Sequence, residues 1–75
     1  MNTTRLDHLW KRGRDFLGVH YPIMCGAMTW VSEPQLVSAV CNAGAFASIA
    51  CGNMPPDALA RHIEETRART AKPFA

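Results

Sequence analysis

The feature that most constrains this chain is a pair of short apolar runs, each enclosed by glycines and separated by one helix-forming segment. Residues 21–25 and 45–50 are almost wholly apolar. Short apolar runs bounded by turn residues are typical of strands that are buried on both faces. Strands joined by a helical crossover run parallel, because an antiparallel pair needs only a short turn. The sequence therefore predicts an α/β fold with parallel strands.

The segment between the two runs carries the signals of a helix. Ser32 and Gln35 stand in the S-x-x-Q arrangement of a capping box, in which each side chain satisfies a free backbone N–H of the first turn. Gly44, at the end of the run Asn42-Ala43-Gly44, is able to take the left-handed conformation that closes a helix. Apolar residues recur at helical spacing and form the predicted buried stripe: Leu36, Val37, Val40 and Cys41.

A second helix is predicted after the second apolar run. Pro55 and Pro56 preset φ for its first turn, where Asp57 suits the helix dipole. The helix is expected to end near Thr70. Its expected inner face carries Leu59, Ile63 and Thr66. Residues 72–75 then look like the opening of a third strand, and a sheet built in this order has exposed edges that require more sheet.

Residues 1–16 form a separate helical lead-in. Apolar residues at i, i+3 and i+4 predict a short amphipathic helix there. We expect it to start near Thr3 or Thr4 and to end at Gly13. Phe16 and Leu17 follow as expected apolar anchors.

Composition excludes several classes of protein. The chain has 75 residues, of which 48% are hydrophobic and 19% charged, and its formal net charge is +2. One basic cluster, Lys11, Arg12 and Arg14 beside Asp15, is interpreted as a solvated surface, because a nucleic-acid footprint needs a denser stripe. No apolar run approaches the ~18 residues of a membrane span. The N-terminus lacks the apolar core of a secretory signal, so we expect a cytoplasmic protein with no nucleic-acid or membrane partner.

The cysteines and the chain length add two further expectations. Cys25, Cys41 and Cys51 fit neither the close pairs of a zinc site nor a disulfide framework. We expect reduced, buried thiols and no metal site. A chain of this length buries only about 60% of its unfolded surface, so this one is expected to fold against something.

Several motifs follow one another from Leu17 onward: Leu17-Gly18-Val19-His20-Tyr21-Pro22-Ile23-Met24, Gly26-Ala27-Met28-Thr29-Trp30-Val31, Asn42-Ala43-Gly44, Asn53-Met54-Pro55-Pro56 and Thr70-Ala71-Lys72-Pro73-Phe74. In this order they resemble the N-terminal part of the nitronate monooxygenases, formerly called 2-nitropropane dioxygenases, and of the related flavin-dependent enoyl-acyl-carrier-protein reductases. The resemblance implies an FMN-binding (β/α)8 TIM barrel. Residues 17–75 would be its first βαβα(β) units, so the barrel is incomplete in this chain.

The resemblance also implies where the cofactor lies. In the family the loop after the first strand lies against the flavin, which gives Ala27, Met28 and Thr29 as the cofactor-binding residues here. Small residues let the backbone approach a flat ring, and a thioether packs well on an aromatic face. The family's Gln-Gly-Gly-Met stands here as Cys25-Gly26-Ala27-Met28, and its Asn-Ala-Gly-Gly ends here in Ala45. Both departures bear on flavin geometry and substrate choice.

Catalytic groups are expected elsewhere. The FMN phosphate of such barrels binds at the loops after strands 7 and 8. The family's catalytic histidine is expected beyond residue 75, so this chain is assigned no catalytic residue. None of its own histidines is well placed as a base: His8, His20 and His62.

Some side chains near the predicted loop admit two interpretations. Met28 is either a ring contact or a core filler. Trp30 either shields the cofactor or walls a substrate pocket, or it anchors the loop against the following helix. Ser48 either points into the barrel mouth or bonds nearby backbone. Cys25 is interpreted as core packing, because no local cation or helix N-terminus would lower its pKa.

The parent protein is predicted to be an FMN-dependent oxidoreductase that oxidises alkyl nitronates or similar small acidic-carbon substrates with oxygen. An alternative within the same fold is an NAD(P)H-dependent enoyl reductase. A third reading, from another class, is a non-catalytic fragment that assembles with a partner chain or with itself, because the barrel is incomplete. The chain alone is not expected to be catalytic.

Overall fold

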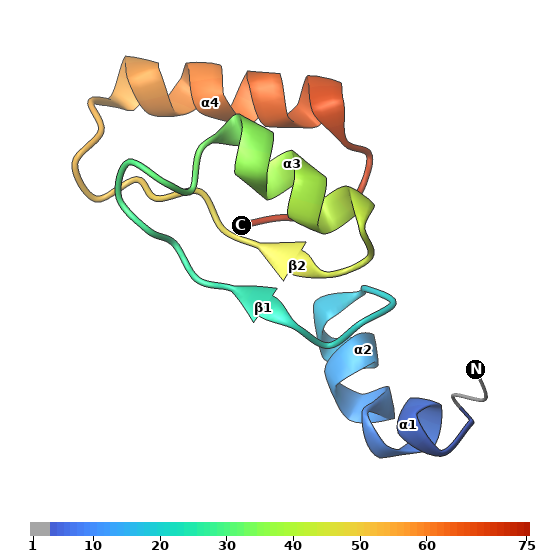
Figure 1. The fold of residues 1–75 in the computed structure, drawn as a ribbon. Coiled ribbons are helices and arrows are strands. Elements are labelled where there is room, and N and C mark those ends of the chain that lie inside the picture. Colours follow the sequence, from blue (N-terminus) through green and yellow to red (C-terminus); the bar gives the residue numbers. More distant parts are fainter. Residues whose placement is uncertain (1–3) are drawn as a thin grey trace.

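A computed structural model describes residues 4–75 and gives the order of elements that the sequence predicts. The elements are α1 (Thr4–Leu9), α2 (Lys11–Leu17), β1 (Met24–Cys25), α3 (Pro34–Asn42), β2 (Phe46–Ala47) and α4 (Pro56–Arg69). β1 and β2 pair in parallel, with Met24 opposite Phe46 and Cys25 opposite Ala47. The prediction of parallel strands joined by a helical crossover is confirmed (Figure 1).

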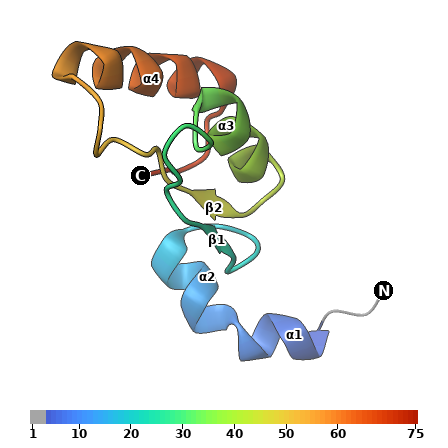
Figure 2. The ribbon, with the colours of Figure 1, turned by 60° about the vertical axis from the view of Figure 1, so that its left-hand side comes forward.

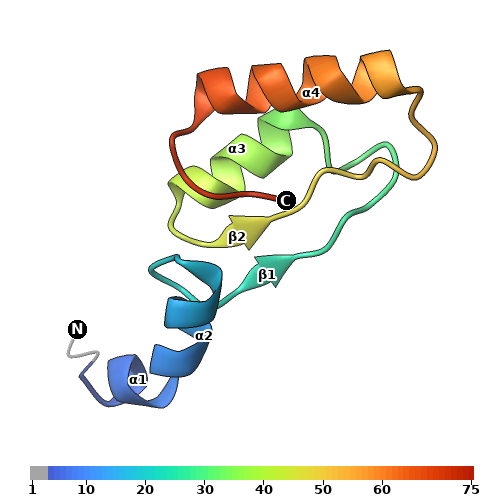
Figure 3. The ribbon, with the colours of Figure 1, turned by 180° about the vertical axis from the view of Figure 1, so that it is seen from behind.

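Helices α3 and α4 form a layer over one face of the sheet. α3 packs on both α4 and β2, and α4 lies outermost (Figures 1 and 3). The loops that follow β1 and β2 lie at one end of the strands, whereas α2 lies at the other end. Turning the molecule shows α1 and α2 extending away from the rest of the fold (Figure 2).

The core lies between α3, α4 and the sheet. Its buried apolar residues are Val37, Cys41, Ala47 and Ile49. Partly buried residues pack around them: Cys25, Val40, Met54, Leu59, Ile63 and Phe74. Val37 and Cys41 are the buried centre of the predicted stripe, and Thr66 is fully buried on the predicted inner face of α4. The helical spacing of apolar residues therefore identified the packed faces of both helices.

The predicted opening of a third strand is confirmed at the last residue. The backbone N–H of Ala75 donates to the Ala47 carbonyl at 3.0 Å, and the N–H of Ile49 donates to the Ala75 carbonyl at 2.7 Å. Ala75 therefore bonds to the residues on both sides of Ser48. This arrangement is the repeating unit of a parallel ladder. The C-terminal residues thus continue the sheet on the far side of β2 from β1.

The end of α3 matches its prediction and also fastens α4. Gly44 takes a φ of 102°, in the left-handed region where a side chain is strained. The Asn42 side-chain N–H donates to the Arg69 carbonyl at 3.0 Å, and the Thr70 hydroxyl donates to Asn42 Oδ1 at 2.5 Å. The carboxyl ends of both helices are therefore joined by one side chain.

The predicted capping box is wrong. Glu33 occupies the N-cap position of α3, and no side chain caps the helix there. The helix begins one residue later than the capping box requires, with Pro34 as its first residue. Ser32 forms hydrogen bonds within the preceding loop instead, so its S-x-x-Q spacing to Gln35 has no capping role.

The N-terminal helix does not end at Gly13. Thr3 lies outside the described residues, α1 begins at Thr4, and after a break at Trp10 the helix resumes as α2 and runs past Gly13 to Leu17. A Cβ atom on Gly13 would lie 2.7 Å from Cβ of Pro22, so the glycine is needed for a close approach of α2 to the chain before β1. The left-handed cap is Gly18, with a φ of 69°.

Phe16 is not an anchor within this chain, because its side chain is 88% exposed. The predicted burial of the first strand on both faces is also not found here. Ile23 is 58% exposed and Met24 is 61% exposed. For Ile23 and Met24 the physical reason is that only one edge of β1 has a neighbouring strand among residues 4–75.

In the part of the chain that the structure describes, no helix is both long and apolar enough to cross a membrane.

Candidate functional site

The loop after β1 is folded around one serine. The Ser32 hydroxyl accepts a hydrogen bond from the Met28 backbone N–H at 2.8 Å and donates to the Gly26 carbonyl at 3.1 Å. The N–H groups of Val31 and Ser32 both donate to the Met28 carbonyl. Ser32 is 1% exposed, so its side chain is shielded from water. The buried hydroxyl fixes the path of residues 26–32.

The three residues predicted to contact a flavin lie together on this loop and face solvent. Ala27 and Thr29 are exposed, and Met28 is 45% exposed. Met28 therefore does not fill the core that residues 4–75 form. A Cβ atom on Gly26 would meet nothing within 4 Å, so the backbone here is open to an approaching group. The loop follows the carboxyl end of β1, where parallel α/β folds place their sites.

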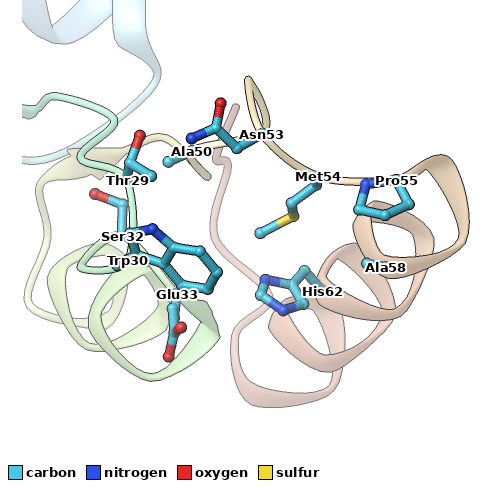
Figure 4. Close-up of a pocket in the computed structure, with 10 residues that line it drawn as sticks. All are labelled: Thr29, Trp30, Ser32, Glu33, Ala50, Asn53, Met54, Pro55, Ala58 and His62. Carbon is cyan, nitrogen blue, oxygen red and sulfur yellow. The ribbon is translucent and has the colours of Figure 1, made fainter.

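A cavity of about 170 Å³ lies beside this loop. Its lining residues come from the loop after β1, the loop after β2 and the first half of α4: Thr29, Trp30, Ser32, Glu33, Ala50, Asn53, Met54, Pro55, Ala58 and His62 (Figure 4). Thr29 belongs both to the predicted site and to the cavity, whereas Ala27 and Met28 do not line it. A backbone bond from Ala50 N–H to the Ser32 carbonyl, at 3.4 Å, links the two loops.

Trp30 lines the cavity and does not anchor the loop. Its side chain is 83% exposed. Figure 4 shows the indole across the cavity from Met54 and His62. Its φ of 67° is the only positive value at a non-glycine residue within 4–75, and such conformations cost roughly 1–3 kcal/mol. The structure does not support the interpretation of Trp30 as an anchor of the loop against α3.

His62 is the polar residue of this region that sequence reasoning set aside. It lies in α4 and lines the cavity, and its Nδ1 atom is buried with no hydrogen-bond partner. Buried polar atoms without partners are rare in folded proteins. The position of His62 in the sequence could have indicated this role, because the first turns of a helix that follows a strand lie near the carboxyl end of that strand. His8 and His20 do not line the cavity. His20 packs edge-on against Tyr21, with ring centroids 4.4 Å apart.

The cysteines carry no reactive arrangement. Cys41 is fully buried, and burial raises the pKa of its thiol above the ordinary value of 9.0. Cys25 is half-buried and packs against the core, in agreement with its interpretation as core packing. Cys51 is exposed, contrary to the expectation of three buried thiols, because it lies in the turn between β2 and α4. Ser48 is half-buried just after β2. Within residues 4–75 no cluster of side chains could hold a metal ion.

The chain is similar in sequence and in structure to proteins of one family. The sequence profile of the nitronate monooxygenase family matches residues 11–75. A nitronate monooxygenase of Paraburkholderia phytofirmans is 48% identical over 58 residues, which are 77% of this chain and 16% of that protein. A (3aS,4S,5R,7aS)-5-hydroxy-7a-methyl-1-oxo-octahydro-1H-indene-4-carboxyl-CoA dehydrogenase of Rhodococcus jostii is 35% identical over 60 residues, covering 80% of this chain and 17% of that protein.

The solved structure of FabK from Thermotoga maritima superposes with a TM-score of 0.81 at 43% identity, over 84% of this chain and 20% of that one. The chain thus spans about a sixth to a fifth of the relatives it matches. Profile, sequence identity and superposed structure agree, and the chain belongs to the nitronate monooxygenase family.

Proposed function

We propose that this chain supplies the first sector of an FMN-dependent (β/α)8 barrel that oxidises alkyl nitronates or similar small acidic-carbon substrates with oxygen. Residues 1–16 are its helical lead-in, and residues 17–75 are its first βαβα(β) units. The observation that carries the proposal is the loop after β1. It is fixed by the buried Ser32 hydroxyl and exposes Ala27, Met28 and Thr29 at the carboxyl end of the sheet.

The exposed loop fits one edge of a flavin. FMN, when bound, accepts electrons from the substrate and passes them to oxygen. The contribution of these residues is to bind and orient: Gly26 and Ala27 leave the backbone accessible to a flat ring, and the Met28 thioether packs on an aromatic face. The remaining FMN contacts, including those to the phosphate, belong to loops of later strands.

A variant pair tests this assignment in the flavoprotein that contains the segment. Ala27→Leu places a bulky side chain on the exposed loop, and Ala39→Leu makes the same change on the exposed surface of α3. We expect Ala27→Leu to weaken FMN affinity at least tenfold, about 1.4 kcal/mol, and Ala39→Leu to leave it unchanged. Titration of the apoprotein followed by flavin fluorescence measures both. Equal affinities in the two variants would remove the loop from the flavin site.

The activity itself has a close competitor. FabK, an enoyl-acyl-carrier-protein reductase, and a CoA-ester dehydrogenase are both similar to this chain, so a nicotinamide-dependent reaction is the alternative. Anaerobic stopped-flow mixing with ethylnitronate separates the two. A nitronate monooxygenase loses its oxidised flavin absorbance without nicotinamide. Reduction that requires NADH or NADPH would instead support the reductase.

The exposed apolar residues favour one further candidate, an assembly role for the chain. Ile23, Met24 and Phe16 are each more than half exposed, and β1 has one unpaired edge. Such an edge is a template for pairing with further strands. Native mass spectrometry of the purified chain tests this role. A complex with itself or another chain, without bound flavin, would support a non-catalytic half that needs a complement.

A further inference from the structure

The cavity beside the flavin loop has apolar walls on two sides. The Trp30 indole forms one side, and Met54 and Pro55 form the other (Figure 4). Trp30 is 83% exposed and held at a positive φ, so its position is not explained by packing in the core. Aromatic and thioether groups facing each other across a gap suit a flat or branched apolar ligand. The walls therefore indicate an apolar occupant.

The polar groups of the cavity limit what that occupant carries. His62 Nδ1 is buried without a partner, and a neutral imidazole nitrogen can donate or accept one hydrogen bond. The lining includes one acidic residue, Glu33, and no lysine or arginine. Because no positive charge is available to pair with an anion, the charged head of a nitronate is disfavoured here. The lining is therefore compatible with an occupant that carries one neutral hydrogen-bonding atom, which His62 Nδ1 would bond.

The volume sets the size of the occupant. A cavity of about 150 Å³ accommodates benzene, and this one measures about 170 Å³. Thr29 lines the cavity and is also one of the proposed flavin contacts, so the two sites share one residue of this loop.

We propose that this cavity binds the side group of the substrate: an aromatic ring or branched alkyl group of about benzene size, with at most one neutral hydrogen-bonding atom. The inference rests on the proposed function for the identity of the substrate. Binding of a benzene-sized group in the cavity does not depend on it. In this arrangement Trp30 and Met54 hold the side group, His62 bonds its polar atom, and the acidic carbon remains at the flavin loop.

Binding is tested on the full chain without flavin. Benzyl alcohol and toluene are titrated while the amide and ring signals of Trp30 and His62 are followed by NMR. We expect both to bind and benzyl alcohol to bind roughly two- to tenfold more tightly, because it adds one hydrogen bond. Ala58→Phe should abolish binding, since Ala58 lines the cavity. Ala60→Phe, the same change on the exposed side of α4, should leave it intact. No shift with either probe would mean that the cavity holds water only, and would overturn the proposal.

Specificity is tested in the flavoprotein that contains the segment. Ala58→Phe should lower kcat/KM for phenylnitromethane nitronate at least tenfold relative to ethylnitronate, and Ala60→Phe should not change that ratio. An unchanged ratio in Ala58→Phe overturns the proposal while leaving nitronate oxidation in place. If no nitronate is oxidised by the unaltered protein, the proposed function fails, and the titration with benzyl alcohol still decides whether the cavity binds.

Discussion

At the scale of single residues, Ser32 determines the shape of the loop that carries the proposed flavin contacts. Its hydroxyl satisfies the Met28 N–H and the Gly26 carbonyl in a site that is 1% exposed. A side chain with this double role is costly to remove, because two backbone groups in partly buried bonds lose their partner.

Ser32→Ala is therefore expected to lower the free energy of unfolding by about 1–3 kcal/mol. Ser38→Ala is the matched control: Ser38 is also buried, but its hydroxyl only donates to the Gln35 carbonyl at 3.2 Å, within the same helix. The control should cost less than about 1 kcal/mol. Urea unfolding followed by circular dichroism compares the two, and equal costs would show that the loop does not depend on Ser32.

Cys41 gives a prediction for pH. Burial raises the pKa of its thiol above 9.0, and its Sγ donates to the Pro73 carbonyl at 3.4 Å. The unfolded chain ionises at the ordinary pKa, whereas the folded chain keeps the proton. The contribution to stability is thus complete below pH 9.0 and is lost as the pH rises from there toward the raised value.

This dependence is tested by measuring the midpoint of urea unfolding from about pH 7 to about pH 10.5. That range brackets the ordinary thiol pKa of about 8.5–9. The unaltered chain should lose stability above pH 9.0 more steeply than Cys41→Val, which has no ionisable group there. Cys51→Val removes an exposed thiol and should retain the steep loss. Identical slopes for the unaltered chain and Cys41→Val would show that this thiol has no part in the pH dependence.

At the scale of elements, the contact between α2 and the chain before β1 depends on a glycine in a helix. Gly13 lies against Pro22, and Trp10 packs edge-on against Tyr21 with ring centroids 6.0 Å apart. In an isolated helix, alanine would be favoured over glycine by about 1 kcal/mol. The close approach opposes this preference, since an added Cβ would meet the rigid ring of Pro22 at 2.7 Å.

Gly13→Ala is accordingly expected to move α2 away from Pro22 and to cancel the gain in helix propensity. Nuclear Overhauser contacts between the rings of Trp10 and Tyr21 should weaken. Gly52→Ala is the control, because a Cβ atom there would meet nothing within 4 Å. If Gly13→Ala keeps the ring contacts and raises stability by the full helix preference, the close approach does not constrain the helix.

At the scale of the whole molecule, the fold is uneven in its packing. It measures 44 × 21 × 18 Å, and α1 and α2 form the extension that makes it long (Figure 2). The buried apolar cluster lies entirely in α3, β2 and the residues just after β2. No residue of α2 is buried. Regions with few buried contacts open at lower free energy than the core.

Hydrogen exchange should reveal this difference. Amides of α1 and α2 are expected to exchange through local opening, with free energies below those of Val37, Cys41 and Ala47, which should approach the global value. The measurement is native-state exchange at increasing urea concentration. Equal protection in α2 and the core would show that the lead-in is part of a single cooperative unit.

The sequence determined those features that depend on local patterns. The spacing of apolar residues identified the buried faces of α3 and α4, and the two apolar runs identified parallel strands. Gly44 marked the end of α3 correctly, and Pro55 and Pro56 marked the start of α4 correctly, because left-handed φ values and missing N–H groups are local properties. The motifs from Leu17 onward also identified the family.

Only the tertiary structure decided the roles of residues whose partners are distant in sequence. Ser32 bonds the loop and not the helix, Gly13 fits against Pro22, and Asn42 joins the ends of two helices. His62 and Trp30 come together in one cavity although they are separated by an entire strand and helix. The local sequence determines which conformations and hydrogen bonds a residue can adopt. Which groups approach closely and become buried depends on which surfaces meet in the tertiary structure.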